Sequence, residues 1–197
     1  TKTANYENGA AVNRFILDHN DLLMGADRVH EGVGILHSDY AAFYSDALDN
    51  ENQTLSTEPH RNTFTANNNR IYQQLRQTGI SVSIVDAQGL EDNPFGIRVL
   101  FLPDFSKLSP EEQAAVIRFR EKGGKVYHAE DWGFRIFDGR QRSYEEKVFW
   151  YKLRAKDVLE TEGIVPMVQS LHEDVAVQLL QGDGYTLAVL TNIAVTE

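Results

Sequence analysis

The sequence predicts an α/β protein built on a mostly parallel sheet. Short, continuous apolar runs are typical of strands buried on both faces, and helical or crossover segments separate these runs along the chain. The expected strands of the sheet are Val33–Leu36, Ile80–Val85, Ile97–Leu102 and Lys125–Ala129. This alternation predicts a three-layer sandwich with helices on both faces of the sheet.

A capping box predicts where the helix after the third strand begins. Ser109 can accept a hydrogen bond from an amide of the first turn, and Glu112 can reach back to the amide of Ser109. Pro110 has no amide to lose at the first helical position. The apolar stripe of this helix is predicted to contain Ala115, Val116 and Phe119. Gly123 and Gly124 follow the stripe, and glycine readily adopts the positive φ that ends a helix.

Helical spacing of apolar residues predicts two further helices. Val12 to Leu23 forms an amphipathic N-terminal helix, whose apolar face we expect to dock on the body or on an absent domain. Phe64 to Leu75 forms the second helix, which Gly79 closes. We therefore divide the chain into an N-terminal helix and linker from a preceding domain, residues 1–30, and an α/β domain, residues 31–197. Because the chain does not begin with Met, we expect it to be either a processed product or an excised piece of a longer protein.

The pattern changes after Trp132. Ser143 and Glu146 predict a second capping box and a helix that carries several aromatic residues, followed by a helical turn over Asp157–Glu162. Two alternating segments then flank a Gly-Asp-Gly turn, which predicts an antiparallel hairpin of Val175–Leu179 and Tyr185–Leu190. We expect this hairpin to be added to the parallel sheet.

Composition limits the class of function. A chain of 197 residues with 42% hydrophobic residues can bury one good core. Its net charge of −10 argues against nucleic acid and anionic membrane surfaces as partners, since both require clustered Lys and Arg. The absence of cysteine excludes disulfides, thiolate metal sites and cysteine catalysis, but it does not indicate a compartment. No apolar run approaches the length of a membrane span.

The candidate site residues follow the predicted strands. In an open parallel sheet, ligands bind beyond the carboxyl ends of the strands. The side chains to examine there are His37, Ser38, Asp39, Tyr40, Asp86, Asp104, His128, Glu130 and Asp131. They could hold a divalent metal, or Ser38, His128 and Asp131 could form a relay. The favoured interpretation is structural, because Asp and Ser commonly cap the turns that follow strands. We assign no catalytic residue, metal or cofactor.

Nucleotide-binding motifs are absent from the sequence. It contains neither G-x-x-x-x-G-K-[ST] nor a G-x-G-x-x-G after the first strand. Asp39 and Asp104 imitate only part of the acidic site of a phosphoacceptor receiver domain. The segment Ala41–Arg61 is rich in Asp, Asn, Ser and Thr, unlike the hydroxyl-rich loop of a flavodoxin that leads directly into its first helix.

The order of segments resembles the glutamine-amidotransferase-like domain that follows the catalytic barrel in family 42 β-galactosidases, the β-galactosidase trimerisation domain. The segments that carry this resemblance are Phe15–Leu23, Val33–Asp39, Ile97–Pro103 and Phe119–Val126. The resemblance implies a three-layer sandwich of the flavodoxin-like or class I glutamine-amidotransferase-like kind. It also implies a non-catalytic domain that packs between subunits near the active-site mouth, with the glycosidase acid and nucleophile in the preceding barrel. Amidotransferases place a nucleophilic cysteine after a strand like Lys125–Ala129, and this chain has none. It also contains no barrel, and the family pattern does not account for Val148–Tyr151.

Three functions remain open from the sequence. The preferred one is a non-catalytic accessory domain of a larger, carbohydrate-active protein, with the preceding catalytic domain and neighbouring copies as partners. The second is a stand-alone hydrolase that uses strand-end groups, and its candidates are His37, Asp39, His128, Glu130 and Asp131. The third is a flavodoxin-like module for a small ligand or for regulation. The assembly hypothesis predicts an exposed apolar patch on the N-terminal helix or at Phe149 and Trp150.

Overall fold

The computed structural model describes residues 2–43, 63–130, 133–139, 153–168 and 175–192. It shows a mixed α/β protein with a five-stranded sheet in the order β3-β2-β4-β5-β6. The strands are β2 (Val33–Leu36), β3 (Val82–Val85), β4 (Val99–Leu102), β5 (Lys125–Glu130) and β6 (Gly133–Ile136). The first four pair in parallel, as predicted, and β6 pairs antiparallel with β5 at one edge.

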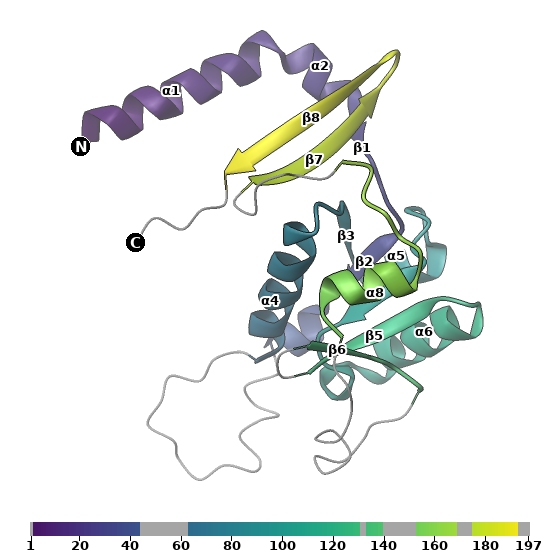
Figure 1. Ribbon diagram of the computed structural model, residues 1–197. Coiled ribbons are helices and arrows are strands. Elements are labelled where there is room, and N and C mark those ends of the chain that lie inside the picture. Colours follow the sequence, from purple (N-terminus) through teal and green to yellow (C-terminus); the bar gives the residue numbers. More distant parts are fainter. Residues whose placement is uncertain (1, 44–62, 131–132, 140–152, 169–174, 193–197) are drawn as a thin grey trace.

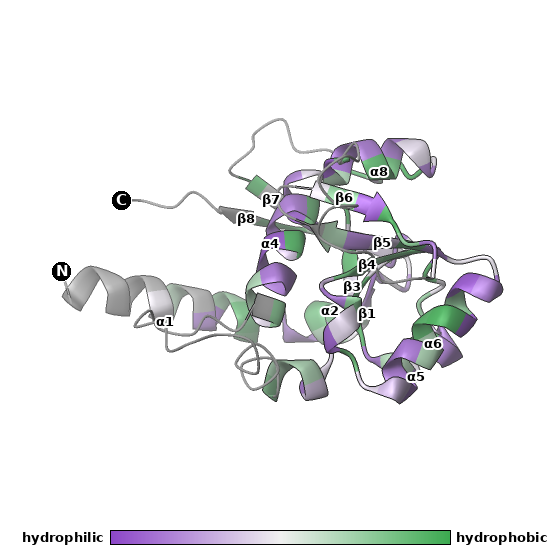
Figure 2. Ribbon diagram, turned by 90° about the horizontal axis from the view of Figure 1, so that it is seen from below, coloured by the Kyte–Doolittle hydropathy of each residue, from purple (hydrophilic) through white to green (hydrophobic). Residues whose placement is uncertain are grey.

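Helices cover both faces of this sheet (Figures 1 and 2). One face carries α4 (Thr63–Gln77) and α8 (Ala155–Thr161), and the other carries α5 (Ala87–Asp92) and α6 (Pro110–Glu121). Alternate residues of β4 serve the two faces: Phe101 packs in the cluster with α4 and α8, whereas Leu100 and Leu102 pack with α5 and α6. Each strand therefore needs apolar residues throughout, which explains its continuous apolar sequence.

The capping box that the sequence predicts is confirmed. The Ser109 hydroxyl accepts a hydrogen bond from the Glu112 amide at 3.2 Å, and the Glu112 carboxylate accepts one from the Ser109 amide at 2.8 Å. Gly123 ends the helix with a φ of 97°, a conformation that favours glycine. Lys125 then begins β5. Local chemistry therefore fixes both ends of α6.

The C-terminal hairpin is not added to the parallel sheet, and that prediction was wrong. β7 (Val175–Gly182) and β8 (Tyr185–Asn192) pair with β1 (Ala26–Arg28) in a separate antiparallel sheet, in the order β1-β7-β8. β1 directly precedes β2 in the chain, so it draws the hairpin to the amino end of the parallel strands. Three residues are too few to show an alternating pattern, which is why the sequence did not reveal β1.

The N-terminal helix forms but is interrupted. It consists of α1 (Lys2–Asp18) and α2 (Asn20–Met24), which separate at His19. The His19 ring stacks on the Phe15 ring with 4.3 Å between ring centroids, and its Nδ1 lies 2.9 Å from the carbonyl oxygen of Phe15. Figure 1 shows α1 extending away from the five-stranded sheet. The apolar side chains of Phe15, Ile16 and Leu17 on α1 are exposed and do not dock on the body of the protein.

Several predicted features lie outside the described residues. They are the capping box at Ser143 and Glu146, the apolar pair Phe149 and Trp150, and most of the segment Ala41–Arg61. None of the described helices is both long enough and apolar enough to cross a membrane.

Removing the capping serine tests how much the α6 start contributes to stability. We expect Ser109→Ala to lower the free energy of unfolding by about 1 kcal/mol, because the Glu112 amide loses its partner. Urea denaturation measures this change. Glu111→Gln is the matched control: it lies in the same turn outside the capping box and should change stability by less than about 0.5 kcal/mol. Equal midpoints for Ser109→Ala and the wild type would contradict the assignment.

Candidate functional site

The carboxyl ends of β2, β4 and β5 lie side by side, and they carry the predicted site residues. His37 follows β2, Asp104 follows β4, and His128 lies within β5 in register with Leu102. This register brings His128 beside the exit of β4, where its Nε2 is 3.9 Å from the Asp104 carboxylate. Of the predicted residues, Asp104 and His128 are thus brought together across neighbouring strands.

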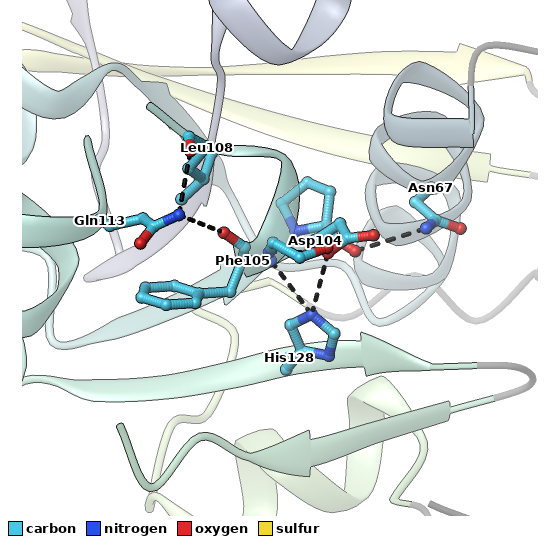
Figure 3. Close-up of polar contacts among 8 residues, drawn as sticks. Asn67, Asp104, Phe105, Leu108, Gln113 and His128 are labelled. Carbon is cyan, nitrogen blue, oxygen red and sulfur yellow. Dashed lines mark hydrogen bonds and ion pairs between the residues drawn. The ribbon is translucent and has the colours of Figure 1, made fainter. Parts of the chain in front are cut away.

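His128 holds the backbone of the loop that leaves β4 (Figure 3). Its Nε2 accepts a hydrogen bond from the Phe105 amide at 3.2 Å. The contact between Nε2 and Asp104 is too long for a hydrogen bond and is electrostatic.

Asp104 caps the short helix η1 (Phe105–Lys107). Its Oδ1 accepts hydrogen bonds from the Ser106 amide at 2.9 Å and from the Ser106 hydroxyl at 2.7 Å. Burial works to raise the pKa of Asp104, but the interactions with His128 and Ser106 outweigh burial and hold this pKa below its ordinary value. Asp104 is therefore a stably ionised capping group, which is unsuited to taking up a proton at neutral pH.

Two amide side chains that the sequence analysis missed complete this loop. The Gln113 side chain donates hydrogen bonds to the carbonyl oxygens of Leu108, at 3.0 Å, and Phe105, at 3.4 Å. The Asn67 side chain donates to the carbonyl oxygen of Pro103 at 3.4 Å. Both residues lie on helices, and no local pattern marks a helical amide that binds a distant loop. Figure 3 shows them on either side of Asp104 and Phe105.

The residues after β2 form a second, separate group. His37 Nε2 lies 3.0 Å from Asp39 Oδ1, and both side chains are exposed. Ser38 is buried, and its hydroxyl accepts a hydrogen bond from the Ala41 amide at 2.9 Å, which caps the helical residues 39–43. Tyr40 lies on this helical turn and is partly exposed. These groups organise the turn after β2.

Asp86 also caps a helix. It follows β3, and its Oδ1 accepts a hydrogen bond from the Gly89 amide at 2.7 Å at the start of α5. The same use of a strand-end polar residue therefore recurs after three strands of the sheet, at Ser38, Asp86 and Asp104.

The described residues do not assemble the metal site or the relay that the sequence leaves open. Among them, no group of three or more His, Cys, Asp or Glu side chains could hold a metal ion. Within the same part of the chain, the Ser38 hydroxyl bonds the Ala41 amide and does not reach His128. Glu130 ends β5, but its side chain lies outside the described part, as does Asp131. The chemistry of the group is therefore capping and positioning of backbone.

Two cavities of more than 300 Å³ lie away from the strand-end residues. One, of about 360 Å³, is at the amino ends of β4 and β5, and its charged lining residues include Arg98, Lys122, Lys125 and Glu162. The other, of about 370 Å³, lies between the end of α4 and α8. None of the predicted strand-end residues lines either cavity.

Comparison with protein-family models and with curated proteins finds no match to this chain.

Replacing Asp104 tests the capping role and its dependence on pH. We expect Asp104→Ala to lower the free energy of unfolding by about 1 kcal/mol at neutral pH, because the Ser106 amide loses its acceptor. Because the pKa of Asp104 is lower in the folded state than in the unfolded state, its ionised carboxylate stabilises the fold at pH values above the unfolded-state pKa. This stabilisation is lost as the pH falls through the folded-state pKa. The difference in the free energy of unfolding between the wild type and Asp104→Ala should therefore be constant above about pH 5 and become smaller below about pH 4.

Denaturant midpoints measured across this pH range check the expectation. Asp39→Ala is the matched control, because Asp39 makes an exposed ion-pair contact with His37 and caps no buried loop. It should change stability by less than about 1 kcal/mol at neutral pH. If the difference in the free energy of unfolding between the wild type and Asp104→Ala became larger as the pH falls, Asp104 would not be an ionised cap.

Proposed function

We propose that this chain is a non-catalytic, amidotransferase-like assembly domain of a larger, carbohydrate-active protein. Two observations support a non-catalytic role. The strand-end groups Ser38, Asp86 and Asp104 are used in capping bonds, and the sequence contains no cysteine for amidotransferase chemistry. The five-stranded sheet with helices on both faces is compatible with the amidotransferase-like and flavodoxin-like folds.

The observation that carries the proposal is an exposed apolar surface on the helical arm, which we define as α1 and α2, residues 2–24. Large apolar side chains on this arm are between 42% and 79% exposed, namely Phe15, Ile16, Leu17, Leu22 and Met24. Leaving apolar surface in water costs roughly 25 cal/mol per Å². Several large apolar side chains exposed on one short segment indicate an interaction surface.

A second copy of the chain is the occupant that the charges on the arm favour. Arg14 and Asp18 flank the apolar residues, and in the described part of the chain neither makes an ion pair. Because they are four residues apart on α1, Arg14 and Asp18 lie on one face of the helix, between Phe15 and Leu17. If two arms pack antiparallel on this face, Arg14 of each copy faces Asp18 of the other. A two-fold contact repeats each such pair, so this surface is self-complementary.

A charge-swap experiment tests this contact. We expect the 197-residue chain to self-associate, with Arg14→Glu weakening association about 10- to 30-fold, because two attractive pairs become repulsive. Arg14→Glu combined with Asp18→Arg should restore association, since the charges are exchanged and remain complementary. Sedimentation equilibrium measures the dissociation constants, and it distinguishes a dimer from the trimer that the resemblance implies.

Two further variants make the test decisive. Leu17→Ser removes the apolar contact and should abolish association, whereas Val165→Ser removes an equally exposed apolar side chain from the body and should leave association unchanged. A monomeric wild type, or a double charge variant no better than Arg14→Glu alone, would contradict pairing through the arm.

A further inference from the structure

A small polar cavity lies between the two sheets. It has a volume of about 140 Å³ and lies where β1 and β7 face the end of α4 and the start of β3. Figure 1 shows the hairpin sheet beyond this end of α4. The polar side chains that line the cavity are Arg28, Tyr72, Arg76, Ser81 and Gln178. Each of them carries a hydrogen-bond donor, and no carboxylate is among the lining residues.

The two arginines at this cavity have no carboxylate partner in the described part of the chain. Arg28 Nε donates a hydrogen bond to the Ser81 hydroxyl at 3.3 Å. The guanidinium carbon of Arg76 lies 5.9 Å from the centre of the Tyr72 ring. By contrast, Arg118 pairs with Glu91. In a chain of net charge −10, two half-buried arginines at one cavity without a carboxylate form a local concentration of positive charge.

The neighbouring carboxylates are not paired with these arginines in the described part of the chain. Glu31 lies next to the cavity, but its two oxygens accept hydrogen bonds from the amides of Ser81, at 2.5 Å, and Met167, at 2.6 Å. Asp27 adjoins Arg28 on β1, and successive strand residues point to opposite faces. Burial, followed by the charge of Arg28, lowers the pKa of His30, and the charge of Asp27 opposes this.

We infer that this cavity binds an oxyanion group, a phosphate or a carboxylate, between Arg28 and Arg76. A guanidinium group matches both anions because its planar fork donates two parallel hydrogen bonds. Ser81, Tyr72 and Gln178 supply further donors. The volume is below the roughly 300–1,000 Å³ of pockets for drug-sized ligands, so it fits a small anion or the anionic end of a larger molecule.

Thermal unfolding in inorganic phosphate tests the site. Phosphate replaces chloride at constant ionic strength, so that general screening does not change. Above the dissociation constant, each tenfold increase in phosphate should raise the Tm of the wild type by about 2–4 °C, because a ligand that binds only the folded state stabilises it. Sulfate and acetate, titrated in the same way, distinguish a tetrahedral oxyanion from a carboxylate as the preferred group.

Charge-removing variants locate the effect. Within the described residues, the Arg76 side chain lies over the Tyr72 ring and makes no hydrogen bond, so Arg76→Gln removes none. It should weaken phosphate binding at least about tenfold. Arg28→Gln should do the same, and Arg118→Gln, the control on α6, should keep the wild-type response. An absent response in the wild type to all three anions, or an equal response in Arg76→Gln, would overturn the site. Association through the helical arm should be unchanged in Arg76→Gln, so the two proposals are tested separately.

Discussion

Burial of β4 on both faces is the constraint on which the rest of this fold depends. Phe101 points into one layer, where its ring meets the Phe134 ring edge-on with 4.8 Å between centroids, and Leu100 and Leu102 point into the other. A strand buried in this way requires a neighbour on each side and helices above and below. The positions of α4 and α8, and of α5 and α6, follow from that requirement.

The same constraint explains why the polar strand-end residues are occupied. Where a buried strand ends, the first amides of the next turn lie close to the core and need hydrogen-bond partners. Ser38, Asp86 and Asp104 supply side-chain oxygens to these amides, and the imidazole of His128 serves the Phe105 amide. Residue types that suggest catalysis at the end of a parallel sheet are therefore also those that the backbone needs there.

Local signals made the core of the fold predictable, and nonlocal pairing limited the rest. The capping box at Ser109 and the continuous apolar strands are written in adjacent residues, and the structure confirms them. The sequence places the ends of parallel strands on one edge but does not give the strand order. Since β4 lies between β2 and β5, the strands carrying His37 and His128 are separated by two strand spacings, about 10 Å. The pairing of β1 with β7 and the bond from Asn67 to Pro103 likewise depend on distant residues.

The hairpin sheet changes where partners and ligands would meet this protein. β1 ties the hairpin to the amino end of the parallel strands, and the Tyr185 hydroxyl donates a hydrogen bond to the carbonyl oxygen of Leu22 at 2.7 Å, which ties α2 to the hairpin. Both the helical arm and the arginine-lined cavity therefore depend on this second sheet. The two proposed surfaces thus lie away from the strand ends where the fold class would place an active site. An assembly role uses this arrangement directly, because contacts made through the arm leave the capped strand ends unchanged.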